Sequence, residues 1–258
     1  MTRVQRPDGT IVNTIASLNW SGYQISKFAQ YAQSGWTIPI VVRPLPAYAT
    51  NYYSSTWTGI GGGFGTDISA PLIQAGFEQD LIGSAPKYYF WYEIYGGSAN
   101  TPGAVQLISP GLVAHAGDSA GSVVIWQPSS PGATSGPVTF GLCNFSYSIC
   151  VNVYLGRGAI GSKDQPSEKP GNSVEWIVEA PLVNGLKSYI ADFDFVSFAG
   201  DCWAPVYQNG AACNTMNSSG PSPIDMYQKI SGILRHMTTA NSLATDGTFS
   251  DVYVYGQQ

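Results

Sequence analysis

The sequence predicts an all-β protein, a sandwich of two antiparallel sheets. Short segments rich in β-branched and aromatic residues recur along the chain, separated by clusters of Gly, Pro, Asn and Asp. Regular turns between short strands are typical of β-sandwiches. Hydrophobic residues make up 44% of the 258 residues, and all-β domains of roughly 200–250 residues often stay undivided. We therefore expect a single domain over residues 1–258, with residues 1–18 as an N-terminal extension.

Seven segments have the composition of strands. They are short, contain many β-branched and aromatic residues, and end at turn-forming residues. We expect strands at residues 52–60, 88–95, 122–127, 146–155, 173–179, 194–198 and 251–255.

One segment near the C-terminus has helical spacing instead. Apolar residues recur there at intervals of three and four, and Ser222 and Pro223 are placed like a helix cap and a first-turn residue. The apolar residues are Met226, Ile230, Ile233, Leu234 and Met237. We expect one short helix here, packed on the outside of the sandwich.

Few side chains are charged. Asp, Glu, Lys and Arg make up 10% of the chain, where about 25% is usual. With 11 Lys and Arg and a formal net charge of −5, no basic surface for nucleic acid or an anionic membrane is expected. Few positive groups also limit self-repulsion when the carboxylates are protonated. Acid tolerance is therefore one interpretation of this composition, and a sheet surface rich in Ser, Thr, Asn and Gln is the other.

The cysteines indicate an oxidising compartment. Neither Cys143 with Cys150 nor Cys202 with Cys213 has the C-x2-C spacing of a zinc site, and we favour these sequence-local pairs as two disulfides. Four unpaired thiols in the core are the alternative. The first thirty residues lack the pattern of a signal peptide, and no apolar run is long enough to span a membrane. We expect a secreted protein whose signal peptide is not part of this chain.

A serine-hydrolase pattern, Gly117-Asp118-Ser119-Ala120-Gly121, is better explained as a turn between strands. A nucleophile elbow needs a helix directly after the Ser, whereas the residues that follow are typical of a strand. The two histidines, His115 and His236, are then ordinary residues at the surface or at a helix end. We expect neither a metal nor a cofactor.

Glu175 and Glu179 resemble the acid pair of a glycosidase, but their spacing argues against it. In a strand they share a face and lie roughly 13–14 Å apart. Retaining glycosidases need about 5–5.5 Å between the carboxyl groups and inverting ones about 6.5–9.5 Å. A second glycosidase carboxylate would have to come from another strand.

Residues 173–181, Ser-Val-Glu-Trp-Ile-Val-Glu-Ala-Pro, resemble the signature strand of the glutamic peptidases, the eqolisin type or peptidase family G1, and most closely its bacterial members. Further motifs of that family follow the same order along the chain, and the similarity covers roughly residues 19–255. They are Asn19–Tyr23, Trp57–Gly62, Leu72–Gly76, Trp91–Tyr95, the hairpin at Gly117-Asp118, and residues 191–198 and 246–255.

The resemblance implies a concanavalin-A-like sandwich that cleaves peptide bonds at acidic pH with a Gln and Glu dyad, here Gln74 and Glu179. Glu175 matches the family's upstream acid, and Trp57 and Glu93 match positions near its active site. Substrates are expected to bind extended across a sheet face lined by aromatic residues, such as Trp57, Trp91 and Tyr95.

The chemistry of the dyad suits an acid-acting endopeptidase. Glu179 would take a proton from water and later give one to the leaving amine, while the Gln74 amide would stabilise the oxyanion at any pH. A His base would be protonated and idle in acid. Glu179 has to be ionised to act as the base, so its pKa is expected near the working pH, held down by donors such as Gln74 and the Trp57 indole.

The chain departs from the fungal members of the family at two positions. Gly61 stands where they have an Asp, and Ala75 where they commonly have a Thr. Because a carboxylate is missing there, the resemblance supports the dyad more firmly than it supports the family's pH range. The partners expected are protein or peptide substrates, bound by a monomer. The alternatives are a non-catalytic, carbohydrate-binding, lectin-like sandwich and a β-glycanase of the same fold.

Overall fold

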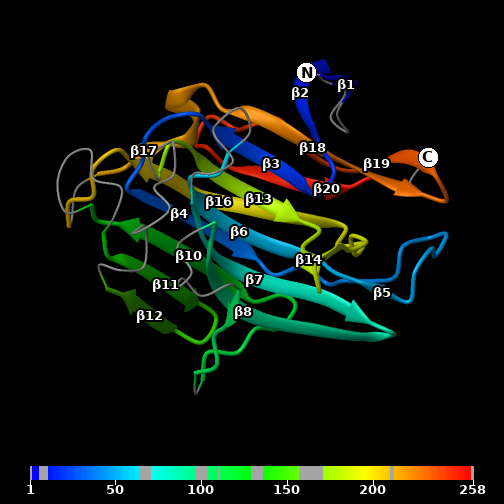
Figure 1. Cartoon of the computed structure of the whole chain (residues 1–258), viewed down its shortest axis with the longest axis horizontal. Coiled ribbons are helices and arrows are strands. Elements are labelled where there is room, and N and C mark those ends of the chain that lie inside the picture. The colour runs from blue at the N-terminus through cyan, green and yellow to red at the C-terminus, as the bar shows by residue number, and fades with distance from the viewer. Residues whose placement is uncertain are drawn as a thin grey trace.

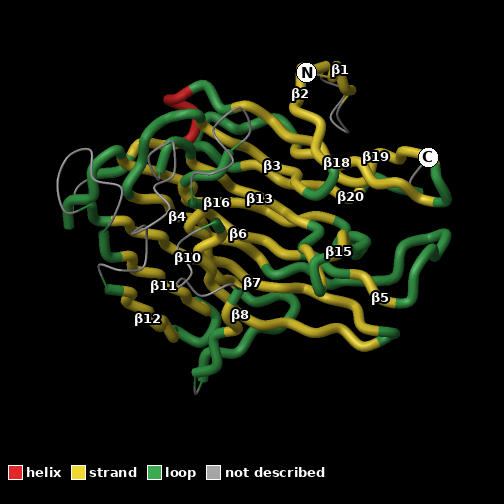
Figure 2. The backbone as a smooth tube through the Cα atoms, viewed as in Figure 1, coloured by secondary structure: helices red, strands yellow, loops and turns green. Residues whose placement is uncertain are grey.

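The computed structural model describes residues 2–5, 11–63, 71–96, 104–109, 111–128, 136–156, 171–209 and 212–256. Strands dominate this part of the chain (Figure 2). All the strand pairings but one are antiparallel. The exception is the parallel pairing of β2 (Ile11–Ser17) with β18 (Ser222–Ile230).

The strands form two layers, visible in Figure 1. The first layer follows the order β8 (Ala85–Tyr95), β7 (Leu72–Ile82), β6 (Ser55–Ile60), β13 (Val174–Glu179) and β3 (Trp20–Ile25). Short strands extend its edges: β5 (Asn51–Tyr52) pairs with β7 and β9 (Val105–Gln106) with β8.

The second layer follows the order β12 (Ile149–Leu155), β11 (Val138–Asn144), β10 (Ser119–Trp126), β4 (Tyr31–Thr37), β16 (Phe195–Ala204) and β20 (Phe249–Tyr253). The hairpin of β18 and β19 (Ile233–Ala240) joins the layers, since β18 pairs with β3 and β19 with β20. The remaining strands are β1 (Thr2–Gln5), β14 (Leu182–Val183), β15 (Leu186–Lys187) and β17 (Asn214–Thr215). This architecture confirms the predicted all-β sandwich.

The main core lies between the layers and follows the period-two pattern of the strands. On β7, Ile73, Ala75 and Phe77 are buried in this core, which places Gln74 on the opposite face of the layer. Polar groups also join the layers, because the Trp176 indole donates to the backbone oxygen of Gln33 at 2.9 Å. The first layer therefore has one face closed by the core and one face free to carry a site.

The predicted helix at the C-terminus is wrong. Its residues form the β18–β19 hairpin, which turns at Ser231 and Gly232 with φ of 51° and 82°. Two of the apolar residues, Ile233 and Leu234, are each 54% exposed, and a register shift after Met226 offsets the strand alternation. Because of the bulge and the turn, the apolar residues of the two strands fall at the three- and four-residue spacing that is typical of a helix. Among the described residues the one helix is η1 (Met216–Ser219).

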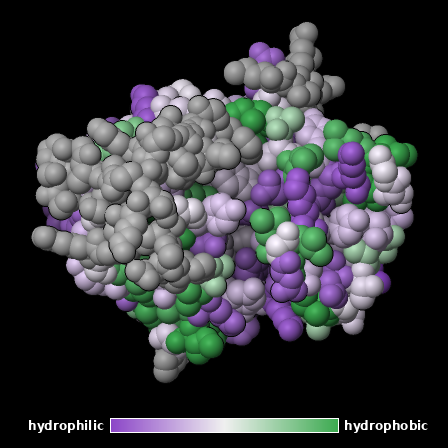
Figure 3. All heavy atoms as spheres, in the orientation of Figure 1, coloured by the Kyte–Doolittle hydropathy of each residue, from purple (hydrophilic) through white to green (hydrophobic). Residues whose placement is uncertain are grey.

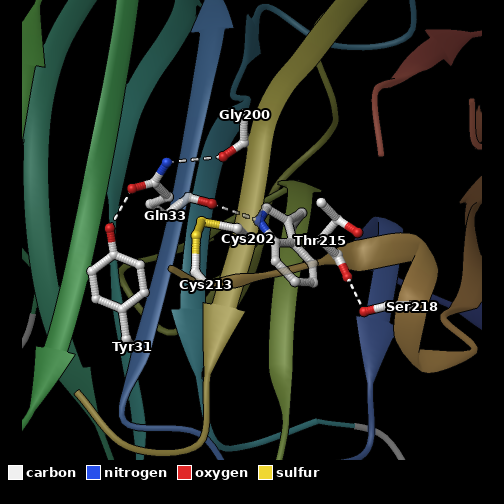
Figure 4. Close-up of a disulfide and its surroundings, with 8 residues drawn as sticks. Tyr31, Gln33, Gly200, Cys202, Cys213, Thr215 and Ser218 are labelled. Carbon is white, nitrogen blue, oxygen red and sulfur yellow. Dashed lines mark hydrogen bonds between the residues drawn. A yellow bond between two sulfur atoms is a disulfide. The ribbon is translucent and has the colours of Figure 1, made fainter. Parts of the chain in front are cut away.

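Both predicted disulfides are present. Cys143–Cys150 crosslinks β11 and β12 at directly opposed positions. Cys202–Cys213 ties β16 to the segment before β17 (Figure 4). Both crosslinks belong to the second layer, and the described cysteines include no free thiol.

The seven predicted strands are all present. Most of their ends differ by one to three residues from the predicted bounds, but the strand predicted over residues 194–198 extends to Ala204. The one predicted to begin at residue 146 begins at Ile149 instead, because the preceding residues form a turn in which the Ser148 amide donates to Phe145. The one predicted over residues 52–60 is split into β5 and β6.

The serine-hydrolase pattern forms a turn that leads into β10, as predicted, although the described residues directly before it form no strand. Ser119 opens that strand at an exposed position, so no nucleophile elbow is formed. His115 contacts Asp118 at 3.5 Å. His236 lies on β19, stacked on Tyr227, and not at a helix end.

No helix in the described part of the chain is long and apolar enough to cross a membrane. On the face seen in Figure 3, polar and apolar residues are interspersed over the described surface.

Candidate active site

The free face of the first layer carries three rows of residues that run across its strands. In the first row, Glu179 on β13 lies opposite Ser55 on β6, which lies opposite Glu78 on β7. The second row is Ile177, Trp57, Gly76 and Trp91, and the third is Glu175, Gly59, Gln74 and Glu93. These residues share a face because positions two apart in a strand point the same way. The predicted dyad is therefore placed on one face by register alone.

A cavity of about 230 Å³ opens on this face. It is lined by both members of the predicted dyad and by three more of the predicted residues, namely Gln74, Glu179, Trp91, Glu93 and Tyr95. The other lining residues are Asn19, Trp20, Ser55, Leu72, Glu78, Ala104, Pro181 and Leu182. Three carboxyl groups and no Lys, Arg or His line the cavity within the described residues.

Beneath the cavity lies a second apolar cluster, separate from the main core. It consists of Trp20, Trp57, Leu72, Trp91, Ile177 and Ile224. The rings of Trp20 and Trp57 meet edge to face, with centroids 5.1 Å apart. Trp57 is fully buried. This cluster excludes water from one side of the carboxyl groups above it.

Glu179 is held by hydrogen-bond donors from two neighbouring elements. The Trp57 Nε1–H donates to Oε2 at 2.9 Å, and the Asn19 side-chain amide donates to Oε1 at 3.1 Å. Burial raises the pKa of Glu179 to about 7, although Trp20, Trp57 and Asn19 each lower it. Trp57 therefore lowers this pKa as expected, whereas Gln74 is not among the donors that do so, and desolvation outweighs the hydrogen bonds, so that the net shift is upward.

Gln74 is oriented by Glu93, which lies opposite on β8. The amide Nε2 donates to the Glu93 carboxyl at 2.7 Å, which points the amide in a defined direction. Its Oε1 is buried and accepts no hydrogen bond. Burial also raises the pKa of Glu93. Gln74 thus presents a fixed, unsatisfied amide oxygen at the cavity, and one amide proton remains for a ligand.

Glu175 does not line the cavity. It is fully buried, and neither carboxyl oxygen makes a hydrogen bond of good geometry. Burial raises its pKa well above the usual range, although the Ser173 side chain lowers it. The segment around Gly63 lies over it, so close that a Cβ there would come within 2.6 Å of Oε1. The structure separates this predicted site residue from the others.

Gly61 has a conformation that explains why an Asp is absent here. Its φ is +87°, and a Cβ would lie 2.2 Å from the backbone oxygen of Pro71. The backbone of this chain thus excludes any side chain at that position.

Sequence reasoning missed Glu78, Ser55 and Asn19 as residues of the site. Asn19 belonged to a recognised motif but was given no role. Glu78 lies four residues after Gln74 on the same strand, so the period-two rule could have placed it on the same face. Ser55 carries no sequence signal, because only strand pairing puts it between Glu78 and Glu179.

Comparisons with known proteins identify the family and the fold. A family model, that of the peptidase A4 family, matches residues 18–246. The fold is similar to that of scytalido-glutamic peptidase, solved with a transition state analog inhibitor, at 20% identity over 92% of this chain and 99% of that chain, with a TM-score of 0.64. Aspergilloglutamic peptidase from Aspergillus niger is 21% identical over 79% of this chain and 99% of that chain, with a TM-score of 0.55. No curated protein sequence matches. The extent of the family match shows that the chain belongs to the peptidase A4 family, the glutamic peptidases.

Proposed function

We propose that the chain is an endopeptidase that hydrolyses peptide bonds with Gln74, Glu179 and an activated water. One observation carries the proposal: the two side chains line the same cavity, each held by a neighbouring side chain and each with a free polar atom or charge to offer. Membership of the glutamic peptidases supplies the reaction class.

In the proposed reaction, ionised Glu179 takes a proton from water, and the hydroxide adds to the peptide carbonyl carbon. The Gln74 amide donates to the oxygen that becomes negative. Asn19 and Trp57 hold the Glu179 carboxylate in place before the reaction, so little free energy is needed to orient it in the transition state. A proton must then reach the leaving nitrogen, and Glu179 has just received one.

The buried site favours a working range at weakly acidic to neutral pH. The base form of Glu179 is populated near its pKa of about 7 and falls tenfold for each pH unit below it. The resemblance implied a more acidic range. The protein itself should nevertheless tolerate acid, because its buried carboxyls are neutral there.

Substrates should be extended segments of protein chains, with apolar side chains over the aromatic rim of the cavity. Trp91 and Tyr95 on β8 and Leu182 on β14 line the cavity together, and Tyr95 and Leu182 are at least half exposed. The two disulfides and the family are consistent with a secreted enzyme.

The experiment that tests the proposal is digestion of denatured casein between pH 3 and 8 by the wild type, Gln74→Ala and Glu179→Gln. We expect the wild type to cleave and both variants to lose most of the activity. Unchanged cleavage by either variant would refute the dyad. If the wild type bound a glycan array and left casein intact, the lectin-like alternative would hold instead.

A further inference from the structure

The cavity contains a carboxyl group that the dyad mechanism does not use. Glu78 lines the cavity but is only 8% exposed, and its Oε2 is buried and accepts no hydrogen bond. It shares a row with Glu179, two strands away. Ser55 and Asp80 are the side chains that act on this carboxyl group. A buried carboxyl oxygen at a cavity without a hydrogen bond of good geometry is placed to meet a ligand.

Ser55 lies between the two carboxyls, opposite each of them in register. Its hydroxyl is fully buried and its Oγ makes no hydrogen bond of good geometry, although it is close enough to Glu78 to lower the pKa of that carboxyl group. A hydroxyl both donates and accepts, so it can pass a proton between two neighbours.

The surroundings of Glu78 favour its protonated form. Burial is the main cause of its strongly raised pKa, and the charges of Asp80 on its own strand and of Glu179 on β13 raise it further. Tyr89, opposite on β8, is a neutral phenol whose pKa is raised by the same carboxyls. The charge of Lys87 lowers the pKa of Asp80. Burial and the neighbouring carboxylates therefore favour the protonated form of Glu78, which shares a hydrogen bond with Asp80.

We infer that Glu78 is a further catalytic residue, the acid that protonates the leaving amine, while Glu179 serves as the base. Two carboxyls whose environments push their protonation apart are the usual arrangement for divided acid and base roles. The inference rests on the proposed function and changes one part of it, because Glu78 takes the place of Glu179 as the group that protonates the leaving amine.

Glu179 takes one proton from water, and the hydroxide adds to the carbonyl carbon. The C–N bond breaks as Glu78 gives its proton to the nitrogen, which leaves as an amine. Glu78 is now a carboxylate and Glu179 a carboxylic acid, and transfer of the proton from Glu179 through the Ser55 hydroxyl to Glu78 restores both groups.

A leaving-group comparison tests the inference. Glu78→Gln keeps the shape of the side chain but cannot give up a proton. The substrates are a peptide that the wild type cleaves and the p-nitrophenyl ester of the same acyl segment, whose leaving group departs without a proton. We expect Glu78→Gln to lower kcat on the peptide by about 10²–10⁴-fold and to lower ester hydrolysis by less than about tenfold.

The controls separate the inference from the proposed function. Glu179→Gln should lose activity on both substrates. Asp201→Asn, the same kind of exchange at a buried carboxyl of the second layer that accepts from Ser34, should retain both. Equal losses on peptide and ester in Glu78→Gln, or no loss on the peptide, would overturn the acid role.

The pH profile gives a second readout that does not depend on the ester. The wild type should show a bell-shaped dependence of kcat on pH, with a descending limb as Glu78 ionises. In Glu78→Gln the residual peptidase activity should keep the ascending limb and lose the descending one. A descending limb that stays in place would contradict the inference.

Discussion

Glu175 and Glu179 lie on the same strand and the same face, yet their environments differ completely. Glu179 sits at the open end of β13, where Trp57 and Asn19 donate to it and the cavity begins. Glu175 lies four residues back, fully buried under the segment around Gly63, and Ser173 is the side chain that lowers its pKa. Burial raises the pKa of both.

The comparison shows that burial alone does not make a carboxyl catalytic. A neutral, enclosed acid such as Glu175 can neither reach water nor exchange its proton quickly. Glu179 combines partial burial with donors that stabilise its charged form, so both of its protonation states are accessible near neutral pH.

The largest expected effect separates the two residues by the same exchange. Glu179→Gln should lower kcat by at least about 10³-fold, because the variant has no base that can accept a proton from the attacking water. Glu175→Gln should stay within about tenfold of the wild type, because it replaces one neutral group by another. Steady-state cleavage of one peptide by both variants measures this contrast. Comparable losses in the two variants would show that Glu175 also takes part in the reaction.

Removal of the oxyanion donor should have the next largest effect. Gln74→Ala should lower kcat by roughly 10²–10³-fold, the usual cost of one such donor, with a smaller change in KM. Single-turnover cleavage separates the chemical step from binding. A rise in KM with kcat unchanged would assign Gln74 to substrate binding only.

Stability should fall as the pH rises, because the folded protein holds protons that the unfolded chain has lost. For Glu179 the folded pKa is about 7 against an ordinary value of 4.5, so the folded state loses roughly 3 kcal/mol of relative stability between pH 4.5 and pH 7 and above. Glu175 acts in the same direction. Urea unfolding at pH 4.5 and 8 should show the loss, and Glu179→Gln and Glu175→Gln should each reduce it. A stability that increases over this range would contradict both pKa directions.

The smallest expected effect is a shift of the pH profile. Trp57→Phe removes the donor to Glu179 Oε2 and leaves the aromatic packing largely in place. The pKa of Glu179 should rise further, by about one unit, since a hydrogen bond to a charged group contributes roughly 1.5 kcal/mol or more. The ascending limb of kcat/KM against pH should move to higher pH. An unmoved limb would mean that Asn19 and Trp20 suffice to hold the charge.

Much of the site could be predicted because sequence motifs and the alternation of side chains along a strand depend only on residues close together in the chain. Gln74 was identified by its motif, and alternation placed it on the face opposite the core. The same alternation applied to Glu78, four residues later, but nothing in the sequence distinguishes it from a solvated surface acid. Its role depends on Ser55 and Glu179, which reach it only through pairing with β6 and β13.

The prediction of a helix near the C-terminus was wrong for a related reason. Spacing at three and four residues appeared across Ser231 and Gly232, but two strands meet there in a hairpin and pair with β3 and β20. Partners far apart in the sequence override a local period.

By itself the sequence determined the all-β class, both disulfides, the family motifs and the identity of the Gln and Glu expected to act. These follow from composition, spacing and residues close together in the chain. Only the tertiary structure decided which glutamates reach the cavity, which way the pKa of Glu179 moves, and that Glu78 belongs to the site. Those properties depend on desolvation and on donors from strands distant in sequence, and these exist only once the layers have packed.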